Sequence, residues 1–185
     1  TAVPGYLEEE AVWGRLEKLI REVQTPLLVG APISDLQGMH VFNSAVLFNP
    51  NGTVLDRYDK VHLVPFGEYL PLTPLLGWLR KLVLMGDFSP GRRLTVFRHD
   101  AIAPFSVLIC FEDLFPDLCR RFIRQGAQML VVITNDAWFI HSAASLQHAQ
   151  ASVFRAIEGR VWVARAANTG WSGFIDPAGR RLAAP

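Results

Sequence analysis

Apolar residues recur with two different periods along this chain, and the periods predict its elements. At residues 5–23 they return every three or four positions, which predicts an amphipathic helix with acidic residues in its first turn. Two further helices are predicted at 114–124, ended by Gly126, and at 145–158. The face of the first helix predicted to be buried consists of Val12, Leu16, Leu19, Ile20 and Val23.

Short apolar runs and turn-forming dipeptides predict the strands. A hairpin is expected at 43–60 around Asn-Pro-Asn-Gly, and a second at 171–182 around Pro-Ala-Gly. Strands that alternate with helices and then give way to hairpins predict an α/β fold, with helices covering continuous apolar strands. The runs predicted as buried strands are 26–33, 105–109, 128–135 and 161–168.

Residues 70–92 interrupt this alternation with several prolines and glycines. We predict a long excursion with one short helical part, because loops of this length in compact domains often act as lids or binding loops. Within it, an apolar arm at 74–88 carries Arg80 and Lys81, as is typical of a segment that lies in a membrane interface. The alternative, in which its leucines pack into the domain, stays open.

Composition narrows the classes of protein. The chain has 185 residues, half of them hydrophobic, so it is expected to form one domain, 1–185. A net charge of +1 without a basic stripe argues against nucleic-acid binding. No apolar run reaches the roughly 18–20 residues that span a bilayer. Two cysteines leave the redox compartment open, and the spacing of the five histidines predicts no metal site.

Cys110 ends an apolar run and directly precedes a predicted helix. Helix N-terminal amides at such a position stabilise a thiolate, which favours a nucleophile. The competing interpretation is a core thiol, because free cysteine is among the most buried residue types. The second cysteine, Cys119, lies inside the predicted helix and is expected to be core.

Lys60 follows a predicted strand and precedes a turn rich in proline and glycine, with Glu68 eight residues further on. Lysines are normally solvated surface residues. Yet Lys60 and Cys110 both fall at strand ends, which is where α/β folds place their sites. A papain-like pair of Cys110 with His62 or His148 is a weaker alternative.

Several segments together resemble one known family, the nitrilase superfamily of carbon–nitrogen hydrolases. The resemblance is stronger to its membrane-bound branch, the apolipoprotein N-acyltransferases, and covers nearly the whole chain in the expected order. Lys-x-His-Leu-x-Pro-Phe-Gly-Glu is its most specific motif. The segments are YDKVHLVPFGEYLP, LICFEDLFP, TNDAWF, QHAQASVFRAIEGR and RAANTGWSGFIDPAGR.

The resemblance implies an αββα sandwich and a Glu-Lys-Cys triad, with the lysine at Lys60 and the cysteine at Cys110. The thiolate would attack an acyl carbonyl, while Lys60 and the backbone N–H of Phe111 stabilise the oxyanion. Glu68 matches a family glutamate that orients the lysine, and Glu112 matches an acid that supports the site.

Asn43 and Trp138 match positions that line the site in this family. For both residues a structural role, as a strand-cap amide and as a core aromatic, stays open. The family usually has glycine where Ile140 stands, which puts the local turn near Trp138 in question.

The first member of the triad has no match in this sequence. In the family it is the glutamate of a segment like Trp-Pro-Glu-Thr-Ala-Val-Pro, so Thr1 is similar to the residue directly after it. Glu8, Glu9 and Glu10 are better explained as the acidic first turn of a helix. The family's first strand and helix and its membrane helices have no match either. We therefore expect an incomplete catalytic domain that is inactive alone.

The activity implied by the resemblance moves a phospholipid acyl chain, through a cysteine thioester, to the N-terminal diacylglyceryl-cysteine of an apolipoprotein. Its partners would be the phospholipid donor, the apolipoprotein acceptor and the membrane, without a cofactor. The domain would lie on the periplasmic face of the inner membrane. The alternatives are a soluble amidase of the same superfamily that cleaves a small amide, and a non-catalytic fragment.

Overall fold

The computed structural model describes residues 7, 9–35, 37–71, 88–139 and 142–183. Its first part is a three-stranded antiparallel sheet of β1 (Leu27–Ser34), β2 (Val41–Phe48) and β3 (Val54–Asp59), in that order. The predicted hairpin is confirmed, because β2 and β3 pair antiparallel and the turn between them closes with hydrogen bonds at 49–53.

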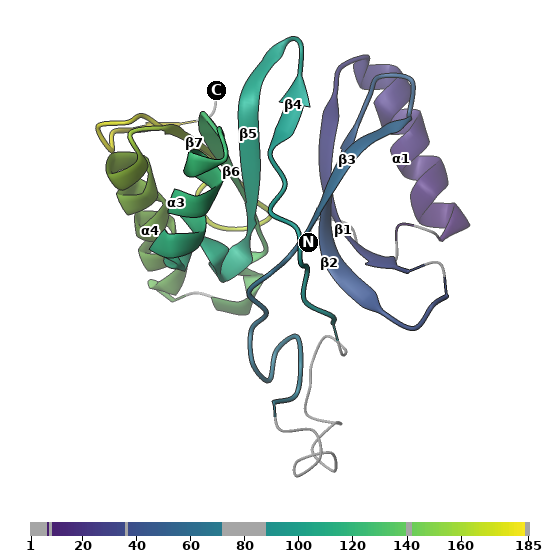
Figure 1. Cartoon of the computed structure of the whole chain (residues 1–185), viewed down its shortest axis with the longest axis horizontal. Helices are drawn as coiled ribbons and strands as arrows, with labels where there is room; N and C mark the ends of the chain where they lie inside the picture. Colours follow the sequence, from purple (N-terminus) through teal and green to yellow (C-terminus); the bar gives the residue numbers. More distant parts are fainter. Residues whose placement is uncertain (1–6, 8, 36, 72–87, 140–141, 184–185) are drawn as a thin grey trace.

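Helix α1 (Glu10–Val23) covers the outer face of this sheet (Figure 1). Leu16 and Ile20 are buried against the strands, as predicted. Leu19 and Val23 are 44% and 42% exposed, so the predicted buried face was too wide. Leu19 lies about 100° around the helix axis from Ile20, outside the narrow stripe along which a single helix touches a sheet. Val23 lies on the buried side but is the last residue of the helix.

The second sheet has six strands in the order β4-β5-β6-β7-β8-β9. Its centre, β5-β6-β7, is parallel, and antiparallel strands extend it at both edges. The predicted central strands and the C-terminal hairpin are confirmed, while β4 was missed because three residues are too short for a period. The bounds are β4 Phe97–His99, β5 Ile102–Ile109, β6 Met129–Thr134, β7 Trp162–Ala167, β8 Gly173–Ile175 and β9 Arg181–Ala183.

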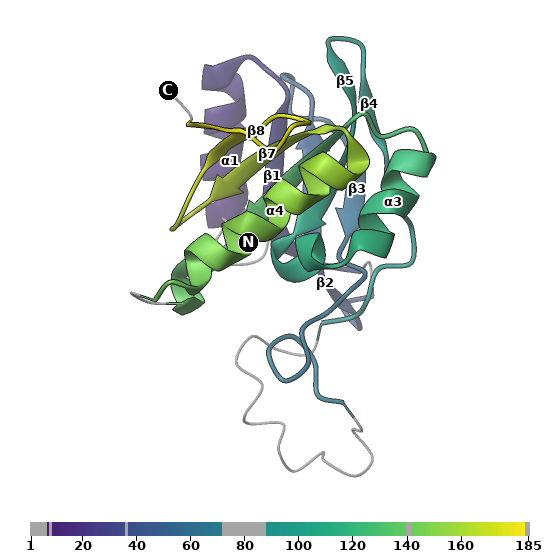
Figure 2. The same ribbon diagram turned by 90° about the vertical axis from the view of Figure 1, so that its left-hand side faces the viewer.

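Helices α3 (Pro116–Arg124) and α4 (Ala144–Gly159) cover the far face of the second sheet (Figure 2). The predicted helix at 114–124 begins two residues late, because Pro116 occupies its first turn, where a missing N–H costs nothing. The residues before it form a separate 3₁₀ turn, η2 (Cys110–Leu114), and a second such turn, η3 (Asp136–Phe139), follows β6.

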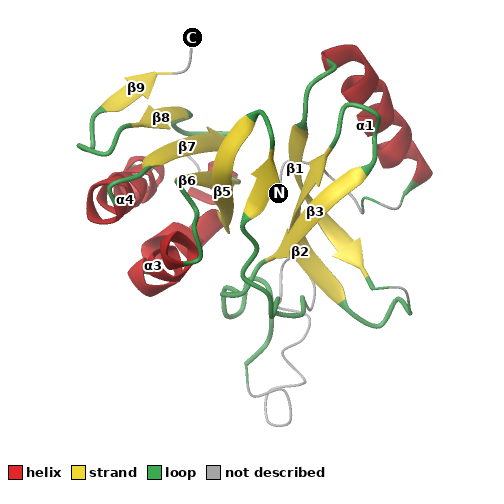
Figure 3. Ribbon diagram, turned by 45° about the horizontal axis from the view of Figure 1, so that its top comes forward, coloured by secondary structure: helices red, strands yellow, loops and turns green. Residues whose placement is uncertain are grey.

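The layers run helix, sheet, sheet, helix, which confirms the αββα arrangement (Figures 1 and 3). Strand β5 is buried from Phe105 to Ile109 because one of its faces meets the first sheet and the other meets the helices. The core between the sheets joins residues of β2 and β3, including Leu47 and Tyr58, to residues of β5, including Val107.

Most of the predicted excursion, residues 72–87, lies outside the described residues, and so does Ile140. The arm at 74–88 therefore stays a prediction. Its described flanks are anchored, because Phe88 is buried and its N–H donates to the carbonyl of Glu68 at 2.8 Å. No helix within the described ranges is both long and apolar enough to cross a membrane.

Gly91 supports the end of β3 at very close range. A Cβ on Gly91 would stand 2.0 Å from the carbonyl oxygen of Asp59, and the Gly91 N–H donates to the carbonyl of Lys60 at 2.8 Å. We expect Gly91→Ala to destabilise the fold by about 2 kcal/mol or more, because backbone rather than a flexible side chain must move.

Gly14→Ala is the control. Gly14 lies in α1 with open space around it, so this substitution is expected to stabilise the fold by about 0.5–1 kcal/mol. Urea denaturation of both variants measures the difference, and equal effects would contradict the account.

Candidate active site

Two strand ends from different sheets meet at the Glu112 carboxylate. Oε1 accepts hydrogen bonds from the Tyr58 hydroxyl at 2.8 Å and from the backbone N–H of Val61 and His62 at 2.9 and 3.1 Å. Oε2 accepts from the N–H of Ile109 at 2.9 Å. One carboxylate thus ties the end of β3 to the end of β5, and so positions the residues that follow both strands.

Glu112 is completely buried, and this burial affects the pKa of its carboxyl group. Burial raises the pKa of its carboxyl group, while the backbone hydrogen bonds, the Tyr58 hydroxyl and the Lys60 charge oppose the rise. The same environment raises the pKa of Tyr58 well above its usual value, first through burial and then through the neighbouring carboxylate. The Glu112 side chain is absent from the lining of the cavity described below, and lies behind it.

Cys110 is the first residue after β5 and has a φ of 55°, in the left-handed region. A non-glycine residue in this conformation costs of order 1–3 kcal/mol and needs a surrounding structure that imposes it. The hydrogen bond from the neighbouring Ile109 N–H to Glu112 is part of that structure. Cys110 is partly exposed and stands at a strained strand end.

Lys60 is the first residue after β3, and its side chain is fully buried. Its Nζ donates to Oε2 of Glu68 at 2.7 Å, and the Val64 N–H donates to the same oxygen at 2.8 Å. Asn43 Nδ2 donates to Oε1 of Glu68 at 2.7 Å, whereas Asn43 Oδ1 has no partner among the described residues. The hydrogen bonds from Asn43 and from the Val64 N–H fix the carboxylate of Glu68, and this carboxylate holds the ammonium group of Lys60 in place.

One cavity of about 190 Å³ collects most of the predicted site residues. Asn43 is not part of its lining, but contacts it through Glu68. Trp138 contributes a wall from η3 and is 52% exposed. A thiol and a fixed amino group that share so small a space are placed to act together on one carbonyl group. The lining residues are Lys60, Val64, Gly67, Glu68, Cys110, Phe111 and Trp138.

Outside the cavity lining lies a group of buried titratable side chains that sequence reasoning missed, here named the charge cluster: Asp113, Asp136, His148 and Arg165. His148 Nε2 lies 3.0 Å from Asp113 Oδ1, and its Nδ1 lies 2.9 Å from Asp136 Oδ1. Arg165 donates to both acids, at 3.1 and 3.0 Å. The available signal was an arginine inside the apolar run 161–168, which needs a buried partner.

His148 serves the charge cluster rather than the thiol. Both of its ring nitrogens face carboxylates, and its ring packs against Phe111 with centroids 5.0 Å apart. The ring of His62 stacks on Phe115 at 4.3 Å. Cys119 is buried in α3, as predicted. Among the described residues no group of three or more His, Cys, Asp or Glu side chains could hold a metal ion.

The charge of His148 gives stability a predictable pH dependence. Burial lowers its pKa and Arg165 lowers it too, but the hydrogen bonds and charges of Asp113 and Asp136 outweigh both, so the folded-state pKa is raised. Its stabilising contribution is therefore complete below about pH 6.5, the ordinary value, and is lost as pH rises through the folded-state pKa.

We expect the free energy of unfolding of the parent protein to fall relative to that of His148→Gln as pH rises above about 6.5. Each unit by which the folded-state pKa exceeds the unfolded value contributes about 1.4 kcal/mol to this fall. Urea denaturation at a series of pH values measures the free energy of unfolding of both proteins. The contributions of the other histidines are the same in both and cancel in the difference. If the free energy of unfolding of the parent stays constant or rises relative to that of His148→Gln as pH rises, the raised pKa of His148 is wrong.

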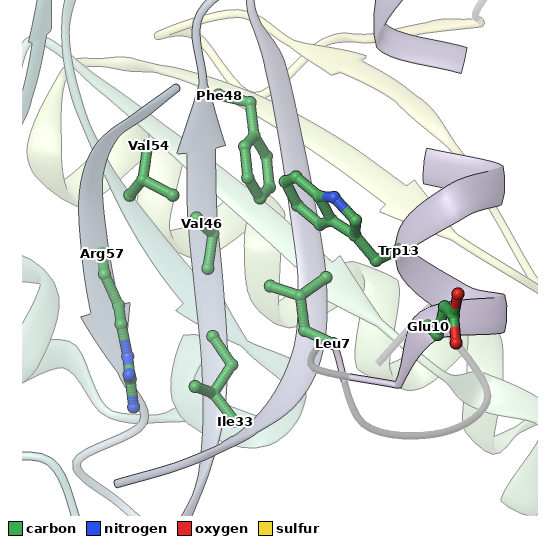
Figure 4. Close-up of a pocket in the computed structure, with 8 residues that line it drawn as sticks. All are labelled: Leu7, Glu10, Trp13, Ile33, Val46, Phe48, Val54 and Arg57. Carbon is green, nitrogen blue, oxygen red and sulfur yellow. The ribbon is translucent and has the colours of Figure 1, made fainter. Parts of the chain in front are cut away.

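Two larger cavities lack chemistry of this kind. One of about 390 Å³ lies between α1 and the first sheet, where Figure 4 shows Trp13 of α1 over Phe48 of β2. Its charged lining residues are Glu10 and Arg57, and Arg57 is paired with Asp59. Another, of about 690 Å³, lies between β1 and strands β6, β7 and β8, and is mostly apolar. Neither is lined by a cysteine.

Comparisons with known proteins show which proteins this chain is similar to. The apolipoprotein N-acyltransferase of Geobacter metallireducens is 45% identical over an alignment of 183 residues, which covers 97% of this chain and 35% of that protein. The apolipoprotein N-acyltransferase of Methylococcus capsulatus is 38% identical over an alignment of 187 residues, gaps included, which covers 99% of this chain and 36% of that protein. The chain thus spans little more than a third of the length of these curated relatives.

A solved structure shows the same fold. The carbon–nitrogen hydrolase from Helicobacter pylori G27 superposes with a TM-score of 0.72 at 16% identity, over 94% of this chain and 62% of that one. The family described as carbon-nitrogen hydrolase matches residues 2–185. The chain belongs to the carbon-nitrogen hydrolase family.

Proposed function

We propose that this chain is part of the catalytic domain of an N-acyltransferase that modifies lipoproteins. It would move an acyl chain from a phospholipid to Cys110, and then to the N-terminal amine of a diacylglyceryl-cysteine. The observation that carries the proposal is the shared cavity, which is lined both by a cysteine at a strained strand end and by the lysine held by Glu68. The names of the relatives in Geobacter and Methylococcus support the choice of substrates.

In the first half-reaction a general base takes the Cys110 proton, and the thiolate attacks the carbonyl carbon of the phospholipid ester. The oxyanion that forms is stabilised by the Lys60 ammonium and the backbone N–H of Phe111. The ester C–O bond then breaks, and the base returns the proton to the departing alkoxide of the lysophospholipid. The product on the enzyme is a thioester.

In the second half-reaction the α-amine of the acceptor attacks the thioester carbonyl, the C–S bond breaks, and the amine proton passes to the base. Glu68 already accepts three hydrogen bonds, so its proposed role is to orient Lys60 rather than to carry protons. The base is proposed to be the glutamate of the family triad, from outside residues 1–185.

Phospholipid and lipoprotein substrates place the reaction at a membrane surface. We propose the periplasmic face of the inner membrane, with the arm at 74–88 as the part of this chain that meets lipid. The arm would open toward the bilayer to admit the acyl chain and close over the thioester against water.

A second candidate, a soluble amidase, is favoured by one observation. The cavity of about 190 Å³ accommodates a small carboxamide more readily than a long acyl chain. The same nucleophile and oxyanion donors would serve amide hydrolysis, with ammonia as the leaving group.

One assay of the complete polypeptide separates these candidates. The protein is offered a labelled phospholipid with a diacylglyceryl-cysteine peptide, and separately a series of small amides. The proposal expects an N-acylated peptide and no ammonia. Ammonia without lipid transfer would establish the amidase instead. If neither product forms, the result favours a non-catalytic domain.

A further inference from the structure

The charge cluster joins the two turns that carry cavity residues. Asp113 shares η2 with Cys110, and Asp136 shares η3 with Trp138. Arg165 of β7 bridges the acids, because its Nη1 donates to Asp113 Oδ2 at 3.1 Å and its Nη2 to Asp136 Oδ2 at 3.0 Å. A single guanidinium group in the parallel sheet therefore holds both turns.

His148 of α4 makes a second bridge between the same acids, through its two ring nitrogens. Its ring also packs against Phe111 and Phe139, with centroids 5.0 and 5.9 Å away. Phe111 itself lines the cavity. The cluster thus contacts the cavity wall directly and through the backbone of both turns.

Stability alone gives a weak reason for this arrangement. All four side chains are at least nine-tenths buried, and burying ions is costly enough that apolar residues of similar volume often stabilise a protein as well. What paired, directional hydrogen bonds add is a fixed geometry between the elements that they join. Here those elements are the turn of the nucleophile and the turn of Trp138.

We propose that the charge cluster is a positioning device that sets the separation of η2 and η3, and with it the place of the Cys110 thiol relative to Lys60 and Trp138. Its members do not line the cavity, so they act on the reaction through Cys110. The inference rests on the proposed function only in taking Cys110 as the nucleophile.

Alkylation of Cys110 by iodoacetamide tests the device without any acyl donor, so its outcome does not depend on the acyltransferase assignment. Asp136→Asn removes one charge and keeps the shape of the side chain. Cys119 is the internal control, because burial raises the pKa of its thiol to about 12 and only unfolding exposes it. Asp176→Asn is the matched variant, a buried carboxylate that binds two backbone N–H groups in the turn before β9.

Peptide mass spectrometry follows the two cysteines separately in the complete chain. We expect Asp136→Asn to slow Cys110 alkylation at least about fivefold, because a thiol displaced within the cavity meets the reagent in a less favourable orientation. Access is not limiting, since Cys110 is already partly exposed. Thr134→Val, which removes one hydrogen bond to Asp136, should slow the alkylation of Cys110 less than Asp136→Asn does. Asp176→Asn should leave the alkylation rate of Cys110 within about twofold of that of the parent.

The proposal is overturned if Cys110 in Asp136→Asn and Thr134→Val reacts at the parent rate while Cys119 stays protected. It is also overturned if Asp176→Asn slows Cys110 equally, since the effect would then follow stability alone. If Asp136→Asn exposes Cys119, that variant is unfolding. The alkylation rate of Cys110 in Thr134→Val is then compared with the rates in the parent and in Asp176→Asn by the same two criteria.

Discussion

Cys110→Ser is expected to lower acyl transfer by the complete polypeptide on the order of 10⁴-fold or more, because it removes the nucleophile on which both half-reactions depend. The fold should survive, since Cys110 is partly exposed and serine occupies slightly less space. We expect the change in the free energy of unfolding to stay within about 1 kcal/mol. Transfer of a labelled acyl chain to a lipopeptide measures the first quantity, and urea denaturation the second.

Cys119→Ala is the matched control for this substitution. Cys119 is buried in α3, away from the cavity lining, so the variant should lose stability by about 1 kcal/mol and keep its transfer rate. Transfer that persists in Cys110→Ser, or that disappears equally in Cys119→Ala, would show that the thiol at 110 is not the nucleophile.

Lys60→Met is expected to lower the transfer rate by about 10²–10³-fold through the loss of an oxyanion-stabilising group. Lys60→Arg should fail nearly as badly, because a planar guanidinium cannot replace a compact ammonium in a fully buried position. Both rates are measured with saturating donor, so that the chemical step rather than binding is compared.

Stability must be separated from chemistry at this position. Lys60→Met leaves the buried Glu68 carboxylate without its cation, which costs about 3–5 kcal/mol. Adding Glu68→Gln removes the unpaired charge, so the double variant should regain much of the stability and none of the activity. If transfer returns together with stability, Lys60 is a structural residue and the proposed oxyanion role is wrong.

The parts of the site that sequence could predict are those that local pattern and motif place at strand ends. Lys60 and Cys110 each directly follow a strand, and the structure brings both into one cavity with Glu68. The alternation of strands and helices predicted an α/β fold for the same reason, since burial on one or both faces dictates which positions are apolar. The αββα order of the layers was implied by the family resemblance.

The parts that could not be predicted depend on contacts between distant elements. Asp113, Asp136, His148 and Arg165 come from two turns, a helix and a strand, and no local period relates them. The two acids and the histidine each fit an ordinary polar position, and the arginine in its apolar run indicates a buried partner without identifying it. Only the folded chain shows that the four are mutual partners, and that they are buried rather than at the surface.

Short elements and helix faces were missed for other reasons. Strand β4 has three residues, and its place at the sheet edge follows from pairing with β5 rather than from its own sequence. The buried face of α1 was drawn too wide because hydrophobicity marks which residues can be buried, whereas the sheet beneath decides which are. Leu19 and Val23 remain exposed on that account.

The central claim is a covalent acyl intermediate on Cys110, and mass spectrometry of the complete polypeptide tests it most directly. The protein is incubated with phospholipid in the absence of acceptor, digested and mapped. The account predicts an acyl chain on the peptide that contains Cys110, which neutral hydroxylamine removes and which a lipopeptide acceptor discharges as N-acyl product. An acyl group on another residue, or product formed at full rate without any adduct at Cys110, would contradict it.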